Sequence, residues 1–237
     1  VAQATNVLGT VNPLEKIVAK AHEKGAYVLV DGAQGIQHLK TDVVAADFDF
    51  YVFSGHKIYA PTGIGILYGK ESLLEQLPPW QGGGDMVKSV SFAKTTYADL
   101  PLKFEAGTSN YVGAIVLGEA LSYLINIGID EIHSYEKELT DYALKKISAI
   151  PGITIYGTSA NKVGIASVLA DGVHHADMGE RVDKMGIAVR TGRMSADPTV
   201  HHVGLTGLLL ASWTFYNTKS EIDALCEGVE KAIKMLR

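Results

Sequence analysis

Residues 48–57 read FDFYVFSGHK, an apolar, strand-like run that ends in Ser54, Gly55, His56 and Lys57. A hydroxyl, an imidazole and an amine therefore follow one another at the end of a single predicted strand. In open α/β sheets, ligands bind beyond the carboxyl ends of the strands. The stretch thus predicts a binding site as well as a strand.

A second predicted strand lies upstream of this stretch. Residues 26–30, AYVLV, form the continuous apolar run that is typical of a strand buried on both faces, and polar Asp31 and Gln34 follow it. An amphipathic helix is predicted between Asn12, its expected N-cap, and this strand. The order strand, helix, strand with short links indicates a layered α/β sheet.

Length and composition narrow the class of protein. The 237 residues are 47% hydrophobic and 20% charged, as in a globular protein with a substantial core. The net charge of −5 gives no reason to expect a nucleic acid partner, and no apolar run approaches the roughly 20 residues of a membrane-spanning helix. The single cysteine fits a reducing, cytoplasmic location. Because the sequence opens on Val1 in what reads as a strand and loop, we expect it to begin partway through a domain.

The rest of the chain divides near residue 128. We expect an α/β domain in residues 1–128 and a smaller α+β domain in residues 129–237. Residues 80–110 have little periodicity and predict a long irregular segment. The further predicted elements are strands at 63–69, 153–156, 163–169, 188–190 and 207–216, helices at 71–77, 111–127, 129–149 and 176–185, and a last helix opened by a capping box of Thr218 and Glu221.

A pyridoxal phosphate site follows from the two strand ends if the strands are parallel neighbours. Asp31, Gln34, Ser54, His56 and Lys57 then meet at one edge of the sheet. A desolvated lysine amine can bond covalently to an aldehyde, and a carboxylate that keeps a pyridine nitrogen protonated makes pyridoxal phosphate an electron sink. Ser54 and His56 could hold its phosphate and Gln34 its ring hydroxyl. An aspartate or a lysine alone at a strand end is more often a solvated loop residue, but the five groups together favour the cofactor.

Five blocks of the sequence resemble consecutive signature blocks of class V aminotransferase-fold enzymes, and specifically of the cysteine desulfurases of the SUF iron–sulfur system. The resemblance runs in the family's order over nearly the whole chain. It implies the fold-type I architecture of pyridoxal phosphate-dependent transferases, here as a partial large domain with a mainly parallel sheet plus a small α+β C-terminal domain. The blocks are VLVDGAQ, DFYVFSGHK, PTGIGILYG, FEAGTSN and GIAVRTG.

The resemblance also implies roles for individual residues. Lys57 would hold pyridoxal phosphate covalently, with Asp31 facing the pyridine nitrogen and Gln34 the 3′-oxygen. Ser54 and His56 match the family's phosphate ligands. Thr108 matches the threonine that reaches the phosphate of a partner subunit, and Asn6 and Arg190 match residues near the substrate carboxylate. The implied protein is a homodimer that converts L-cysteine to L-alanine and passes persulfide sulfur to an acceptor protein for iron–sulfur cluster assembly.

The sequence departs from the family pattern in three places. Ser195 occupies the position of the loop cysteine that carries the sulfur, and a hydroxyl cannot carry persulfide sulfur. Leu210 stands where the family has an arginine that clamps the substrate carboxylate. The part of the family sequence that precedes the position of Val1, with a ring-stacking histidine and a phosphate-binding threonine, is not in this sequence.

Three functional hypotheses remain open at this stage. The chain is a desulfurase-like protein with impaired activity, or a pyridoxal phosphate enzyme for another amino-acid reaction such as β-elimination or transamination, or a non-catalytic remnant that dimerises. Cys226 lies on the apolar face of the last predicted helix and is expected to be a core thiol. The adjacent pairs His174-His175 and His201-His202 should point apart, so no metal site is expected.

Overall fold

The computed structural model describes residues 1–237 and forms two compact units. Each unit has its own sheet and its own apolar core. Two short segments that the sequence analysis assigns to the first domain, 3–12 and 38–40, cluster with the second unit. The first unit consists of Val1–Ala2, Pro13–Gln37 and Thr41–Asn126, and the second of Gln3–Asn12, His38–Lys40 and Ile127–Arg237.

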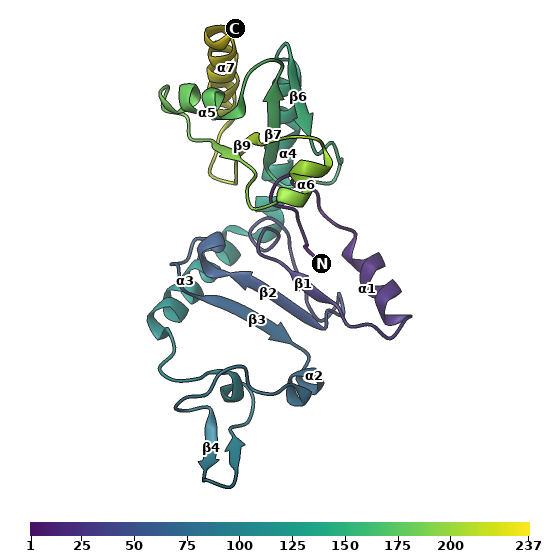
Figure 1. The fold of residues 1–237 in the computed structure, drawn as a ribbon, viewed down its shortest axis with the longest axis vertical. Coiled ribbons are helices and arrows are strands. Elements are labelled where there is room, and N and C mark those ends of the chain that lie inside the picture. Colours follow the sequence, from purple (N-terminus) through teal and green to yellow (C-terminus); the bar gives the residue numbers. More distant parts are fainter. The chain divides into compact units, whose positions relative to one another are not determined.

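The sheet of the first unit has three strands, in the order β1-β2-β3 (Figure 1). Strand β1 (Leu29–Asp31) is parallel to β2 (Phe50–Ser54), as the pyridoxal phosphate hypothesis requires. Strand β3 (Gly65–Gly69) is antiparallel to β2. The sheet is therefore mixed, because the connection between β2 and β3, residues 55–64, carries no crossover helix to the far end of the sheet.

Two local predictions at the start of the first unit are wrong. Strand β1 is shorter than predicted and only its central residue, Val30, is buried, whereas Leu29 is 47% exposed. Helix α1 (Leu14–His22) has Pro13 at its N-cap position with no side-chain cap, so Asn12 does not cap it. The backbone N–H of Asn12 instead donates to the carbonyl oxygen of Gln3, at 2.9 Å.

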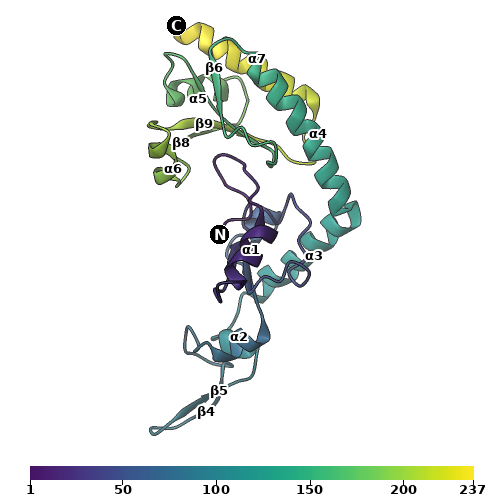
Figure 2. The same cartoon turned by 90° about the vertical axis from the view of Figure 1, so that its right-hand side faces the viewer.

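The remaining helices of the first unit match the sequence analysis, but the irregular segment does not. Helices α2 (Glu71–Gln76) and α3 (Tyr111–Ile127) are where they were predicted. Within residues 80–110, the antiparallel hairpin of β4 (Val87–Val90) and β5 (Thr95–Tyr97) extends from the unit (Figure 2). Each strand is too short to reveal a period-two pattern, so the prediction missed the hairpin.

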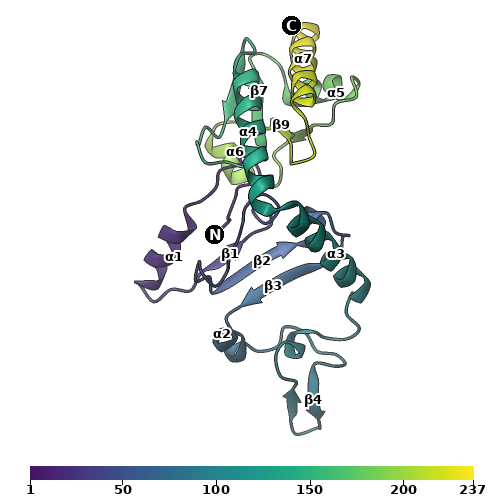
Figure 3. The same ribbon diagram turned by 180° about the vertical axis from the view of Figure 1, so that it is seen from behind.

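The second unit is a four-stranded antiparallel sheet with helices on one face. The strand order is β6-β7-β9-β8, and helix α4 crosses β7 (Figure 3) while it runs beside α7 (Figure 2). The predicted capping box of Thr218 and Glu221 is confirmed at the start of α7. Helix α6 (Asp197–His202) was not predicted. The other bounds are β6 (Ile153–Tyr156), β7 (Ile165–Ala170), β8 (Arg190–Gly192), β9 (Leu208–Ser212), α4 (Ile129–Ser148), α5 (His175–Asp183) and α7 (Lys219–Leu236).

The two faces of this second sheet are covered by different parts of the unit. Alternate residues such as Val168 and Leu209 pack against α4, α5 and α7 in the main core. The opposite face carries Ile165 and Leu210, which pack against Ala4 of segment 3–12. This second face is where the sequence-predicted substrate residues lie.

No single helix is both long enough and apolar enough to cross a membrane, and only α3 and α4 taken together meet those criteria of length and composition.

Candidate active site

The parallel pairing of β1 and β2 places the predicted cofactor residues at one end of the first sheet. In its register, Asp31 lies opposite Val52, two residues before the end of β2 at Ser54. The chain then turns into a short 3-10 helix, Gly55–Ile58, that contains Lys57. A carboxylate and an amine are thus delivered from the carboxyl ends of adjacent parallel strands.

Most of the polar side-chain groups at this edge have no partner within the chain. One carboxylate oxygen of Asp31, Oδ1, accepts a hydrogen bond from the N–H of Ala33 at 2.9 Å, and its Oδ2 has no partner. The half-buried amine of Lys57 makes no ion pair or hydrogen bond. The side chains of Gln34, Ser54 and His56 are likewise unpaired.

The backbone next to Asp31 is packed closely against a neighbouring ring. A Cβ atom on Gly32 would lie 2.0 Å from the ring of Tyr51, so only glycine fits there. Burial raises the pKa of Tyr51 to about 12, which keeps its phenol neutral. This packing fixes the direction in which the chain leaves β1 and therefore the position of Asp31.

This set of side chains fits pyridoxal phosphate. The cofactor requires an amine for its aldehyde, a carboxylate for its pyridine nitrogen, and donors for its phosphate and ring oxygen. Lys57 and Asp31 supply the first two groups, and the unpaired donors of Ser54, His56 and Gln34 supply the rest. Thr108, which the resemblance assigns to a partner's phosphate, is exposed and makes no hydrogen bond.

The predicted substrate residues lie in the second unit. Arg190 is exposed, has no partner, and lies opposite Leu210 in the pairing of β8 with β9. Ser195 is exposed in the loop that follows β8. Asn6 donates a hydrogen bond from its side-chain nitrogen to the carbonyl oxygen of Met194 at 2.8 Å. The second unit thus brings Asn6 to the loop of Ser195, and Leu210 beside Arg190.

A comparison with known families agrees with the fold. The model of the class-V aminotransferase family matches residues 1–225. The chain belongs to the class V aminotransferase family. The family is pyridoxal phosphate-dependent.

Curated relatives of this family member are cysteine desulfurases. The protein of that name from Enterobacter sp. (strain 638) is 49% identical over 238 residues, which cover 100% of this chain and 58% of the relative. The cysteine desulfurase of Shigella sonnei (strain Ss046) is 47% identical with the same coverage. The chain therefore spans 58% of the length of the curated relatives that it matches.

Solved structures of the family resemble the chain closely. The cysteine desulfurase CsdA from Escherichia coli, in an S-sulfonic acid form, gives a TM-score of 0.95 at 42% identity, covering 100% of this chain and 59% of that one. The apo cysteine desulfurase from Thermococcus onnurineus NA1 gives the same TM-score at 31% identity, with 100% and 60% coverage. A complex of the cystine C-S lyase C-DES with its reaction product cysteine persulfide gives 0.84 at 25% identity, with 97% and 59% coverage.

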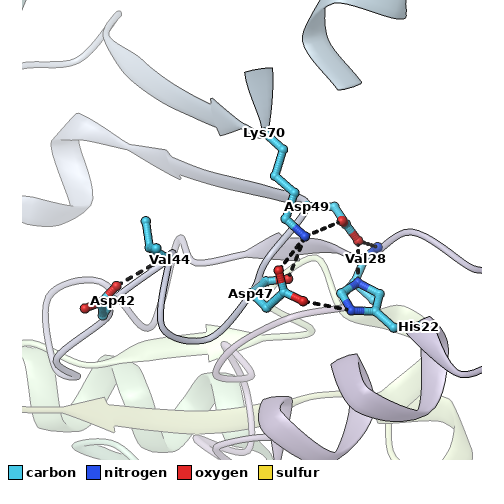
Figure 4. Close-up of polar contacts among 7 residues, drawn as sticks. All are labelled: His22, Val28, Asp42, Val44, Asp47, Asp49 and Lys70. Carbon is cyan, nitrogen blue, oxygen red and sulfur yellow. Dashed lines mark hydrogen bonds and ion pairs between the residues drawn. The ribbon is translucent and has the colours of Figure 1, made fainter. Parts of the chain in front are cut away.

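The sequence analysis missed a cluster of charged side chains in the first unit (Figure 4). Buried Asp49 accepts hydrogen bonds from the backbone N–H of Val28 at 2.7 Å and from Lys70 at 2.9 Å, and its Oδ2 lies 2.8 Å from His22 Nε2. Asp47 lies 2.6 Å from Lys70 and 3.2 Å from the other ring nitrogen of His22. The cluster joins α1, β1 and the end of β3, and Asp49 precedes β2, so it supports the sheet from the end opposite Lys57.

A second polar network, in the second unit, was also missed. Buried Glu136 on α4 lies 2.6 Å from His38 Nδ1 and accepts hydrogen bonds from the hydroxyl of Thr214 and the N–H of Phe215. These partners are 78 to 98 residues away in sequence, so no local pattern could reveal them. The network fixes segment 38–40 and the connection between β9 and α7.

The histidine pair His174-His175 differs from expectation in its geometry. The two rings lie 4.2 Å apart and tilted by 33° rather than pointing apart. The ring of His174 accepts a hydrogen bond from the N–H of Ala176 and so caps the start of α5. Cys226 is buried in the main core, as predicted.

Proposed function

We propose that this chain holds pyridoxal phosphate through Lys57 and belongs to a SUF-type, cysteine desulfurase-like protein in which sulfur transfer is impaired. The observation that carries the proposal is the placement of Asp31 and an unpaired Lys57 at the same end of two adjacent parallel strands. When bound, the cofactor withdraws electrons from the bonds around the substrate's α-carbon.

The chain's own residues would divide the remaining tasks. Lys57 Nζ would hold the cofactor, and as a free amine it would take the proton from the α-carbon of the substrate. Asp31 Oδ2 keeps a proton on the pyridine nitrogen, while the donors of Gln34, Ser54 and His56 hold the cofactor in place. Arg190 and Asn6 bind the carboxylate of the amino acid, a contact strengthened by the charge of the guanidinium.

Two substitutions support the proposal of impaired sulfur transfer. Desulfuration needs a thiolate that attacks the substrate sulfur and keeps it as a persulfide, and Ser195 has no sulfur atom. Leu210 offers no donor to a carboxylate, and the loss of one charge-assisted hydrogen bond weakens binding by roughly 1.5–3 kcal/mol. Both positions belong to the second unit, which carries the predicted substrate residues. The predicted cofactor residues belong to the first unit and are all present.

The oligomeric state, the role of Thr108, the location and the partner protein are proposed from the same resemblance. We propose that the protein is a homodimer in which Thr108 reaches the phosphate of the partner subunit, and that it acts in the cytoplasm with a sulfur-acceptor protein. The lone, buried Cys226 is compatible with a reducing compartment. Light scattering of the purified protein tests the dimer, and a monomeric mass contradicts it.

A second candidate function is a reaction that needs no thiol, such as β-elimination. The similarity to a cystine C-S lyase supports it, because that protein shares the fold and carries out a different reaction from the desulfurases. Ser195 would then have no sulfur to carry, and Arg190 would serve as the principal carboxylate ligand.

Replacing Ser195 tests the impaired-desulfurase proposal. The protein is loaded with pyridoxal phosphate, binding is verified by its visible absorbance, and the release of alanine from L-cysteine is measured for the wild type, Ser195→Cys and the matched Ser195→Ala. We expect the wild type and Ser195→Ala to be equally slow and Ser195→Cys to be faster. Rapid release by the wild type would contradict the impairment.

The same assay separates the remaining alternatives. Release of pyruvate and sulfide by the wild type, with little alanine, supports the elimination function. A protein that forms the dimer but shows no visible absorbance of bound pyridoxal phosphate that is lost on replacing Lys57 supports the non-catalytic alternative.

A further inference from the structure

The turn that displays Ser195 has an unusual backbone. Residues 193–196 form a four-residue turn closed by a hydrogen bond from the N–H of Ala196 to the carbonyl oxygen of Arg193, at 2.9 Å. Its two central residues, Met194 and Ser195, have φ values of 51° and 56°. Turns with positive φ at both central positions strongly prefer glycine, asparagine or aspartate. A Met-Ser pair therefore needs support from outside the turn.

Four contacts provide this support. The side-chain nitrogen of Asn6 donates to the carbonyl oxygen of Met194 at 2.8 Å. The Met194 side chain packs against the apolar clusters of Leu210 and Val200. Arg193 donates to Asp197 at 2.9 Å in an exposed ion pair within the same stretch of chain, and its Nε donates to the carbonyl oxygen of Thr206 at 3.2 Å. Among these, the Asn6 contact is the one that bonds the backbone of a central residue of the turn to a separate segment.

Segment 3–12, which carries Asn6, is itself held firmly on the second sheet. The hydroxyl of Ser167, a fully buried residue on β7, donates to the carbonyl oxygen of Val7 at 2.6 Å. Backbone hydrogen bonds link Val11 to Asn161 at 3.0 Å and Val163 to Gly9 at 2.9 Å. Asn6 therefore projects from a fixed support and can restrain the turn opposite it.

We propose that Asn6 is a positioning residue for the turn that carries Ser195. By holding the Met194 carbonyl, Asn6 keeps two unfavourable backbone conformations in place and so fixes where residue 195 is displayed. The inference deepens the proposed function, on which it rests for the meaning of position 195. The role goes beyond the carboxylate contact expected of Asn6, because it acts on the loop before any substrate is present.

Hydrogen exchange at the Ala196 amide tests this role without cofactor or turnover. The amide is protected by the hydrogen bond that closes the turn, so its exchange rate reports how often the turn opens. Loss of one hydrogen bond lowers the free energy of opening the turn, so the turn should open about five- to tenfold more often. We expect that acceleration in Asn6→Ala and in the shape-preserving Asn6→Asp, with the melting temperature unchanged.

Asn161→Ala provides the matched control. Asn161 is exposed and lies beside the same segment, but its side chain makes no hydrogen bond. Its replacement should leave exchange at Ala196 unchanged. Equal exchange rates in the wild type and both Asn6 variants would overturn the proposal, as would an acceleration by Asn161→Ala of the same size.

A glycine background distinguishes positioning from a general loss of stability. Ser195→Gly removes the cost of the left-handed conformation at one central position, so the turn should depend less on its support. We expect Asn6→Ala to accelerate exchange at Ala196 clearly less in this background than in the wild type. An undiminished effect contradicts the role of Asn6 in holding the strained turn. Since none of these measurements involves catalysis, a failure of the proposed function leaves their outcome unaffected.

Discussion

Arg190 and Leu210 lie directly opposite each other on β8 and β9, so their side chains share one face of the second sheet. Leu210 is only 9% exposed and packs against Ala4, Val163 and Ile165, whereas Arg190 is exposed and has no partner. This face therefore presents one unpaired positive charge beside an apolar surface. Under the proposed function, a single guanidinium is left for the carboxylate of a substrate.

Leu210→Arg should make stability depend on a carboxylate ligand. The new guanidinium would lie near Arg190 and among apolar side chains, so we expect a lower melting temperature than in the wild type. A high concentration of L-alanine should raise the melting temperature more in Leu210→Arg than in the wild type, since the carboxylate can pair with both arginines.

Leu210→Met is the matched control for this change. It keeps the apolar volume and should cost less than about 1.5 kcal/mol, with no added response to L-alanine. An identical response to the ligand in all three proteins would contradict a carboxylate role for this face.

Glu136→Ala should destabilise the protein strongly. It leaves the buried ring of His38 and the hydroxyl of Thr214 without their acceptor, and breaking a buried pair of this kind costs about 3–5 kcal/mol. Denaturant unfolding measures the loss. The control is Glu138→Ala on the same helix, whose exposed ion pair with Lys219 should contribute no more than about 1 kcal/mol. Similar losses in the two variants would disagree with the network described here.

The charged cluster around Asp49 should contribute a pH-dependent part of the stability. Burial alone would raise the pKa of Asp49, but its hydrogen bonds from His22, Lys70 and the N–H of Val28 outweigh burial and lower that pKa below the ordinary value of 3.8. A depressed folded-state pKa adds stability above the unfolded-state pKa, and this stability is lost as the pH falls through the folded-state value.

Asp49→Asn removes this titration and tests the sign of the effect. We expect the variant to be less stable at pH 7 and to lose less of its stability than the wild type when the pH is lowered below about 4. Asp141→Asn, which affects only an exposed ion pair with Lys137, should follow the wild-type profile. If Asp49→Asn lost more stability than the wild type as the pH falls, the lowered pKa of Asp49 would be contradicted.

Cys226 should be unreactive in the folded protein. Burial raises the pKa of its thiol to about 11, so the thiolate is scarce at pH 8. A chromogenic disulfide reagent should react slowly with the native protein and quickly after denaturation. In Ser195→Cys, one thiol should react quickly in the native state because position 195 is exposed. Fast labelling of the native wild type would show that Cys226 is accessible.

The sequence predicted those features that depend on neighbouring residues. The capping box of Thr218 and Glu221 and the regular helices α3 and α4 are local patterns, and the structure has them where they were expected. Helix α6 was missed because Pro198 follows its first residue and its six residues carry no full apolar period. Asn12 failed as a cap because Pro13 holds that position.

The parts that could not be predicted depend on contacts between distant residues. The association of segment 3–12 with β7 and the bond between Asn6 and the Met194 carbonyl join residues more than 150 positions apart. The candidate cofactor residues could be found because each follows directly from the end of a strand. Their convergence depended on the parallel pairing of β1 and β2, which the structure provides.

The most direct test of the cofactor assignment is peptide mapping after the protein has been incubated with pyridoxal phosphate and reduced with borohydride. The account predicts that the label is fixed on Lys57, that it is lost in Lys57→Ala, and that it is retained when the exposed Lys24 is replaced by alanine. An unlabelled Lys57, or a label spread over surface lysines, would contradict the central claim that Asp31 and Lys57 together hold the cofactor.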